Sequence, residues 1–101
     1  KAERHEKAAK YLVRVIKVDP DHQKARAFLG VELAKIGKDK KAKKLLEQAV
    51  HTDPKFARGH VLLGDIYARA GDTKKAKAAY QKAAKLKPKD ADIKAKLEAL
   101  K

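Results

Sequence analysis

Apolar residues recur at helical spacing along the chain, in sets that are separated by glycine or proline. Between residues 23 and 56 two such sets flank Gly37, and each set returns to the same side of a helix every three or four residues. The first set is Phe28, Leu29, Leu33 and Ile36, and the second is Leu45, Leu46, Ala49 and Val50. A glycine at this position suits the left-handed residue that ends a helix. The pattern therefore predicts two helices joined by a tight turn.

The chain repeats this pattern with a period of 34 residues, the spacing of Pro20, Pro54 and Pro88. Aligning residues 23–56 with 57–90 pairs Leu29 with Leu63, Gly30 with Gly64, Ala34 with Ala68, Gly37 with Gly71, Ala42 with Ala76, Ala49 with Ala83 and Pro54 with Pro88. Asp39 and Asp72 stand where a capping carboxylate opens the second helix of each pair. We expect each period to be a helical hairpin whose apolar face is buried by stacking on the next.

Small residues are expected where the two helices of a hairpin approach closely. The predicted contacts are Gly30 with Ala42 and Gly64 with Ala76. Leu46 and Tyr80 follow those alanines by four residues on the same helix face, so we expect them to fill the space where consecutive hairpins meet.

These residues resemble the tetratricopeptide repeat. Two full repeats carry the pattern: Leu29, Gly30, Leu33, Gly37, Ala42, Leu46, Ala49 and Pro54, then Leu63, Gly64, Tyr67, Gly71, Ala76, Tyr80, Ala83 and Pro88. The resemblance implies an all-α fold, a right-handed superhelical stack of antiparallel helical hairpins with about three repeat equivalents. We expect residues 1–22 to be the second helix of a truncated repeat, 23–56 and 57–90 to be full repeats, and 91–101 to be a C-terminal capping helix or the start of a next repeat.

The composition and the first residue bear on the compartment of the protein and on the length of the array. No apolar run among the 101 residues approaches the roughly 20 residues of a membrane span, so we expect a soluble protein. The absence of cysteine does not distinguish a reducing from an oxidising compartment, so the compartment stays open between cytoplasm and periplasm. The first residue is Lys1 and methionine is absent, which favours a fragment of a longer array. Tyr11 and its apolar neighbours in the first segment are expected to be uncovered, so self-association is possible.

The sequence offers no residues for catalysis. Histidines occur at 5, 22, 51 and 60, without the spacing of a metal site, and we expect His60 to be a packing residue. Asp19 and Asp21 flank Pro20 in a turn, which favours a capping role over acid-base chemistry. Serine is absent, and no phosphate-binding glycine loop is found. We therefore predict a protein that is not an enzyme and has no cofactor or metal.

The resemblance implies a concave groove lined by the first helix of each repeat. The groove residues are Lys24, Phe28, Val31, Lys35, Arg58, Val61, Leu62, Asp65 and Arg69. An apolar floor with basic margins suits a peptide or protein partner of acidic or amphipathic character. The alternative is that the apolar residues of this set only pack against neighbouring helices.

Some members of the family hold the C-terminal carboxylate of heat-shock chaperones with asparagine and lysine side chains. This chain contains no asparagine, and Val31 and Asp65 occupy places where that clamp would use an amide. The sequence therefore disfavours a chaperone clamp.

Lysine and arginine number 27 against 13 acidic residues, which gives a formal net charge of +14. Many of the cations are expected on a convex ridge, at Lys40, Lys41, Lys43, Lys44, Lys74, Lys75 and Lys77. Such a ridge could meet nucleic acid or lipid phosphates, but aromatic residues for stacking on bases are not interleaved with it, so nucleic acid is an unlikely partner. The interpretation is an adaptor that binds other proteins, with homo-oligomerisation and binding of anionic surfaces by the ridge as alternatives.

Overall fold

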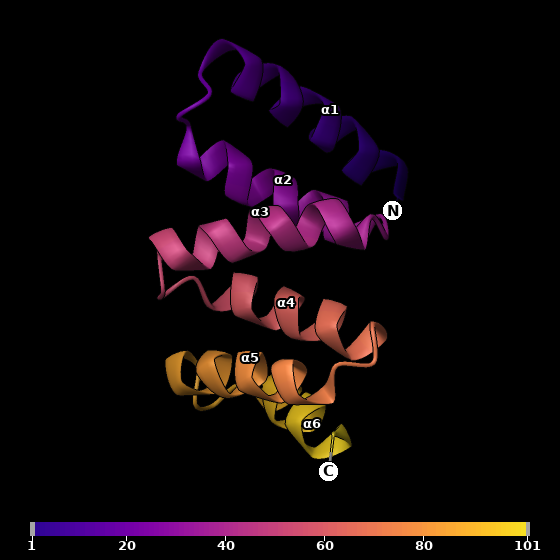
Figure 1. Ribbon diagram of the computed structural model, residues 1–101, viewed down its shortest axis with the longest axis vertical. Helices are drawn as coiled ribbons and strands as arrows, with labels where there is room; N and C mark the ends of the chain where they lie inside the picture. The colour runs from indigo at the N-terminus through magenta and orange to yellow at the C-terminus, as the bar shows by residue number, and fades with distance from the viewer. Residues whose placement is uncertain (1, 101) are drawn as a thin grey trace.

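The structure is a computed structural model that describes residues 2–100. These residues form six α-helices and no strand: α1 (Ala2–Val18), α2 (Gln23–Lys35), α3 (Asp39–Thr52), α4 (Ala57–Arg69), α5 (Thr73–Leu86) and α6 (Ala91–Ala99). They stack in chain order along an axis of 43 Å, with the other two extents at 25 and 22 Å (Figure 1). The predicted all-α stack of helical hairpins is confirmed.

The turn inside each hairpin is built on a glycine. Gly37 and Gly71 both adopt a φ of 83°, in the left-handed region where a side chain is strained. After α2, the Lys38 N–H donates to the Leu33 carbonyl at 2.9 Å, and this bond pairs one of the last carbonyls of the helix. The predicted helix-ending glycines are therefore confirmed.

The two capping aspartates differ. The Asp72 carboxylate accepts a hydrogen bond from the Lys75 N–H at 3.1 Å and caps α5 as predicted. In the preceding hairpin the N-cap of α3 is Lys38, which makes no side-chain cap bond. Asp39 instead turns to Arg69 of α4, so the capping role predicted for Asp39 is wrong. The reason is position: the 34-residue shift pairs Asp72 with Lys38, so Asp39 lies one residue past the cap, inside the first turn of α3.

Each hairpin closes on a glycine that faces a large side chain. A Cβ atom at Gly30 would lie 3.1 Å from Cγ of Leu46, and one at Gly64 would lie 2.4 Å from Cε1 of Tyr80. The closest partners thus lie one helical turn beyond the alanines that the sequence predicted. Leu46 and Tyr80 fill the interior of their own hairpins, not only the junction with the next.

One hydrophobic core runs through the stack from α1 to α5. Its buried members are Ala9, Leu29, Val31, Leu33, Ala34, Ala42, Leu46, Leu63, Ile66 and Ala79. His60 joins this interior with 5% of its surface exposed, and its Nε2 lies 2.9 Å from the carbonyl oxygen of Pro54. The packing role predicted for His60 is confirmed.

None of the helices in residues 2–100 combines the length and the apolar composition that a bilayer crossing requires. In the same range, no His, Asp and Glu side chains gather in a group that could hold a metal ion.

Candidate functional site

The predicted groove residues form matching stripes on α2 and α4. Positions 24, 28, 31 and 35 recur every three or four residues and so share one face of α2, and positions 58, 62, 65 and 69 follow 34 residues later on α4. Helices α2 and α4 also contact each other directly, although α3 separates them in the chain. The fold therefore brings the two stripes to one side of the stack, and we call them the groove stripes.

The apolar members of the groove stripes differ in exposure. Phe28 keeps 51% of its surface exposed, which is unusual for a phenylalanine. Leu62, its counterpart on α4, is half-buried and packs against the core, and Val61 is also half-buried. Val31 is only 2% exposed and belongs to the core, so it supports this surface from beneath. Phe28 is thus the main apolar feature that these helices present to solvent.

Asp65 ties the α4 stripe to two neighbouring helices. Its Oδ1 accepts hydrogen bonds from the Tyr80 hydroxyl at 2.5 Å and from Lys96 Nζ at 2.8 Å. Lys96 Nζ also lies 5.9 Å from the centre of the Tyr80 ring. Burial, followed by the bond to Asp65, raises the pKa of Tyr80 above its ordinary value. The one carboxylate of the groove stripes is therefore already engaged inside the protein.

The other charged members of the stripes are cations. Lys24, Lys35 and Arg58 are exposed, and no ion pair is found for them within residues 2–100. Arg69 donates to both carboxylate oxygens of Asp39, at 2.9 and 3.0 Å. This hydrogen bonding raises the pKa of the Arg69 guanidinium. The exposed charges at the margin of the stripes are therefore basic.

Two hollows in the described part of the protein are lined by other residues than the groove stripes. Each is a cleft between two successive second helices, with the intervening first helix as its floor. The first cleft, between α1 and α3, has a volume of about 840 Å³, and the second, between α3 and α5, has about 720 Å³. None of the nine groove residues lines either cleft. On α2, the cleft is lined by Leu29, Leu33 and Ile36, from another side of the helix than the groove stripe.

The two clefts are copies of one site, related by the 34-residue repeat. Leu29 and Leu33 in the floor of the first correspond to Leu63 and Tyr67 in the second. Their rims differ in charge. The first cleft is lined by six cations, Lys10, Arg14, Lys17, Lys38, Lys41 and Lys44, and by one acid, Glu6.

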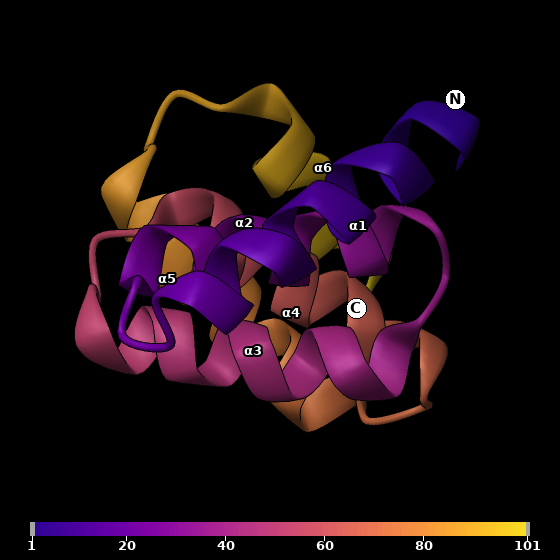
Figure 2. The ribbon, with the colours of Figure 1, turned by 90° about the horizontal axis from the view of Figure 1, so that it is seen from above.

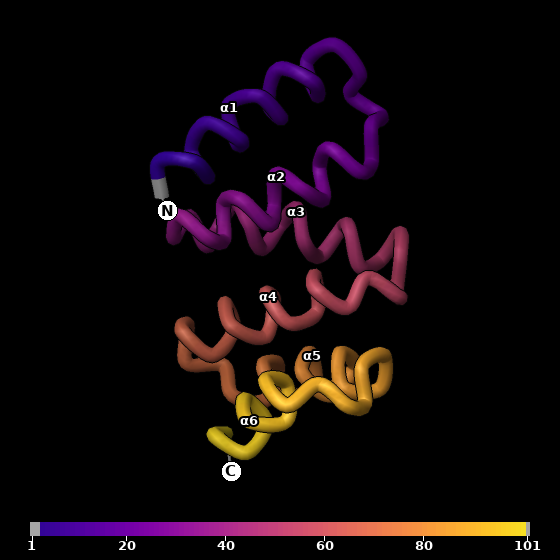
Figure 3. Tube along the Cα trace, turned by 180° about the vertical axis from the view of Figure 1, so that it is seen from behind, coloured from indigo at the N-terminus to yellow at the C-terminus, as the bar shows by residue number. Residues whose placement is uncertain are grey.

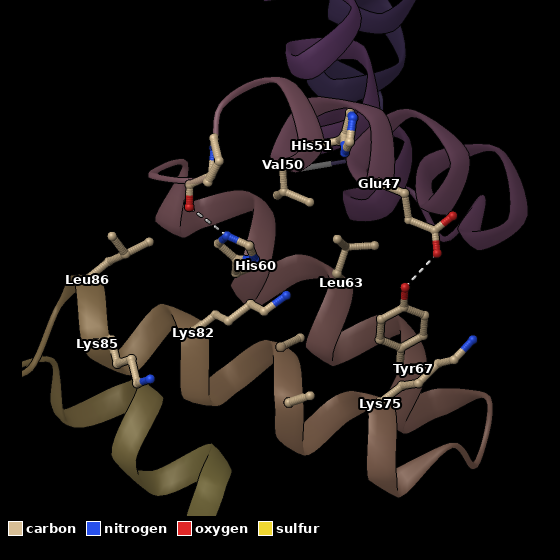
Figure 4. A pocket seen from close by; sticks show the side chains of 13 residues that line it. Glu47, Val50, His51, His60, Leu63, Tyr67, Lys75, Lys82, Lys85 and Leu86 are labelled. Carbon is tan, nitrogen blue, oxygen red and sulfur yellow. Dashed lines mark hydrogen bonds between the residues drawn. The ribbon is translucent and has the colours of Figure 1, made fainter.

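Polar contacts join the floor of the second cleft to both of its walls (Figure 4). The Tyr67 hydroxyl donates to Glu47 Oε2 at 2.5 Å, and Lys75 Nζ lies 5.7 Å from the centre of the Tyr67 ring. Burial, followed by the bond to Glu47, raises the pKa of Tyr67. Lys82 and Lys85 add two cations from α5. This cleft therefore holds an acid where the first cleft, at the equivalent Val13, has an apolar residue.

The predicted convex ridge divides between cleft walls and open surface. Lys41 and Lys44 line the first cleft and Lys75 lines the second. The remaining ridge lysines line neither cleft: Lys40, Lys43, Lys74 and Lys77. Neither cleft was predicted from the sequence, because each is formed by residues of three helices. The sequence contains one sign of them: Lys41 and Lys75, which line the two clefts, are separated by the 34-residue period.

Known proteins share the repeat pattern and the fold described above. A family model described as "Tetratricopeptide repeat" matches residues 1–66 and again residues 37–100. The chain belongs to the tetratricopeptide-repeat family. Proteins of this family are in general non-enzymatic modules that bind other proteins. No curated protein matches this tetratricopeptide-repeat chain.

Solved structures share the tetratricopeptide-repeat fold of this chain. A structure of MamA from Desulfovibrio magneticus RS-1 superimposes with a TM-score of 0.88 at 31% identity, over 97% of this chain and 55% of that one. MamA MSR-1 gives 0.85 at 21% identity, over 96% and 56%. The first tetratricopeptide-repeat domain of Spaghetti (RPAP3), bound to HSP90 peptide SRMEEVD, gives 0.85 at 14% identity, over 97% and 78%. The chain thus spans about half the length of the MamA structures.

Proposed function

We propose that this chain is an interaction scaffold whose groove stripes bind an acidic or amphipathic segment of a partner protein. The exposed ring of Phe28 carries the proposal. A half-exposed phenylalanine costs solvation free energy in the free protein, and a partner side chain that covers it recovers roughly 25 cal/mol per Å² of buried apolar surface. Phe28 therefore acts as the anchor, with half-buried Leu62 as its counterpart one repeat later.

Charge favours an acidic partner on this surface. Lys24 and Lys35 lie one and two turns from Phe28 on the same face of α2, and both are exposed. Because Asp65 is engaged by Tyr80 and Lys96, it offsets little of this positive charge. Opposite charges across an interface raise the association rate and fix the register of the ligand. A segment with an apolar anchor and flanking Asp or Glu residues meets both requirements.

The fold is compatible with such a ligand. The Spaghetti structure holds a short peptide that contains two glutamates and an aspartate. At 14% identity that likeness concerns the fold alone, so the partner of this chain is inferred from its own residues. The missing asparagines continue to argue against a chaperone carboxylate clamp here.

The test is NMR chemical-shift mapping with acidic peptides that carry one leucine or phenylalanine anchor. Saturable shifts at Phe28 and Leu62, which persist at physiological salt, are expected. Phe28→Ala should weaken binding at least tenfold, because it removes the apolar anchor. Tyr11→Ala is the matched control, since Tyr11 is 66% exposed but lies on α1, outside the groove stripes. Equal losses of peptide affinity in the two variants, or chemical shifts that vanish with added salt, would refute peptide binding at the groove stripes.

A further inference from the structure

The first cleft has no assigned role in the proposed function, yet it is lined by six lysine and arginine side chains, against three in the second cleft. Its cations lie in two rows. Lys10, Arg14 and Lys17 lie on α1, and Lys38, the N-cap residue of α3, is followed by Lys41 and Lys44 on that helix. Each row follows helical spacing, so its members line one edge of the cleft. No ion pair within residues 2–100 engages any of the six. The cleft therefore presents two basic rims, with Glu6 as the one acid, at the start of the α1 rim.

Between these rims the surface is apolar. Leu29 and Leu33 form the floor from α2, Leu45 contributes from α3, and Val13 of α1 is 41% exposed in the wall. A ligand for this cleft must therefore combine an apolar stripe with acidic groups on both sides of it. Nucleic acid supplies charge but no aliphatic side chains, and none of the five aromatic residues of this chain lines the first cleft for base stacking.

The shape favours a helical ligand over an extended one. The lining residues of α1 run from Glu6 to Lys17, which corresponds to about 16 Å, or three turns, of helix. The walls are helices whose backbone groups are paired internally, so they offer no strand edge to an extended peptide. An extended backbone on the leucine floor would leave its polar groups unpaired, whereas a helix pairs its own.

We propose that the first cleft is a second docking site, separate from the groove stripes, for an acidic amphipathic helix of a partner protein. The helix places leucine-like residues on the floor and carries Glu or Asp on both flanks, one flank for each basic rim. A second copy of this chain is a poor occupant, since two molecules that each carry a formal charge of +14 repel.

The second cleft is expected to bind such a helix weakly. It has the same floor positions, but Glu47 replaces Val13 and faces the incoming acids. Its floor also carries the Tyr67 hydroxyl, bonded to Glu47, where the first cleft has the aliphatic Leu33 (Figure 4). The second cleft is therefore an internal control. It is built from the equivalent helices one repeat later, but its side chains differ at the positions that the proposal requires.

The experiment measures fluorescence anisotropy of a labelled helical peptide of about 14 residues, with leucines on one stripe and glutamates on both flanks. Lys41→Glu with Lys44→Glu reverses one rim of the first cleft, and Lys75→Glu with Lys82→Glu is the matched pair in the second. The first pair should weaken binding tenfold or more, since like charges then face each other, and the second pair should change it less than threefold. Val13→Glu, which copies Glu47, should act like the first pair. Circular dichroism checks that each variant keeps its helices.

Each remaining outcome overturns the proposal. Equal losses in the two lysine pairs would mean that total charge drives binding. A loss confined to Phe28→Ala would place the peptide in the groove stripes, and such a result would leave the proposed function standing. A DNA duplex that displaces the peptide at physiological salt would identify the cleft as a polyanion site. Absence of saturable binding to the unmodified protein would remove the second docking site, whatever the groove mapping shows.

Discussion

Replacing Gly64 by alanine tests how tightly the second hairpin is closed. Alanine in a helix interior is favoured over glycine by about 1 kcal/mol. Against this gain, the added Cβ would lie 2.4 Å from Cε1 and 2.5 Å from Cδ1 of Tyr80, well inside the contact distance of about 3.5–4.0 Å between carbons. The Tyr80 ring is 4% exposed and its hydroxyl is held by Asp65, so it cannot move aside freely.

The expected result is a net loss of stability. Overpacking a core costs about 1–3 kcal/mol, so after the helix-propensity gain of about 1 kcal/mol Gly64→Ala should destabilise the protein by up to about 2 kcal/mol. Gly30→Ala is the matched control, because its Cβ would meet Leu46 Cγ at the milder distance of 3.1 Å, and we expect it to be within about 1 kcal/mol of neutral. Urea denaturation followed by circular dichroism measures both values.

A double variant isolates the contact. Tyr80→Leu copies the side chain that the first hairpin uses at Leu46, and it should remove the penalty of Gly64→Ala. The double-mutant cycle should therefore show a favourable coupling of about 1 kcal/mol or more between positions 64 and 80. If Gly64→Ala instead stabilises the protein, as at an uncrowded helix position, the close approach described here is wrong.

Three further predictions concern the turn, alkaline pH and an ion pair. Gly71→Ala should cost about 1 kcal/mol by thermal denaturation, because φ is 83° there although no atom within 4 Å obstructs a Cβ; an unchanged melting temperature would contradict the strained turn. The folded state raises the pKa of Tyr80 above its unfolded value, so the stability that this residue contributes is present below about pH 10 and is lost as pH rises further. A tyrosinate absorbance titration and the pH dependence of unfolding should show this loss, and Tyr80→Phe should reduce it. Breaking the exposed pair with Asp39→Ala should cost at most about 1 kcal/mol and less at high salt, and a larger, salt-independent loss would show that the contact with Arg69 is more than a surface pair.

Much of the fold follows from the sequence because its signals are local and repeated. Gly37 and Gly71 end helices by a backbone conformation that few other residues adopt, and the 34-residue period places the same turn in both hairpins. The interior position of His60 could be predicted because its repeat position is a packing position, whatever residue occupies it. These features depend on residues close together in the chain.

Features that depend on side chains from several helices were missed. Asp39 lies one residue past the cap position of α3, and its carboxylate instead accepts two hydrogen bonds from Arg69, 30 residues away. Val31 shares a helix face with Phe28, yet it is buried while Phe28 is exposed, because helical spacing does not show where the neighbouring helices end. The first cleft is likewise formed by α1, α2 and α3 together, so no single amphipathic pattern predicts it.

The stacking order has a consequence for how the protein folds. The main contacts join each helix to the next one in the chain, and beyond these α2 contacts α4. Chains with such short-range contacts close only small loops and fold quickly, and either hairpin can serve as the nucleus from which order spreads. Opening then proceeds inward from α1 and α6, which lie at the two ends of the stack (Figure 3). In the view from above, α1 is the helix nearest the viewer (Figure 2). Amide hydrogen exchange should therefore be slowest in α3 and α4, and a partner held across α2 and α4 would fasten the part of the chain that unfolds last.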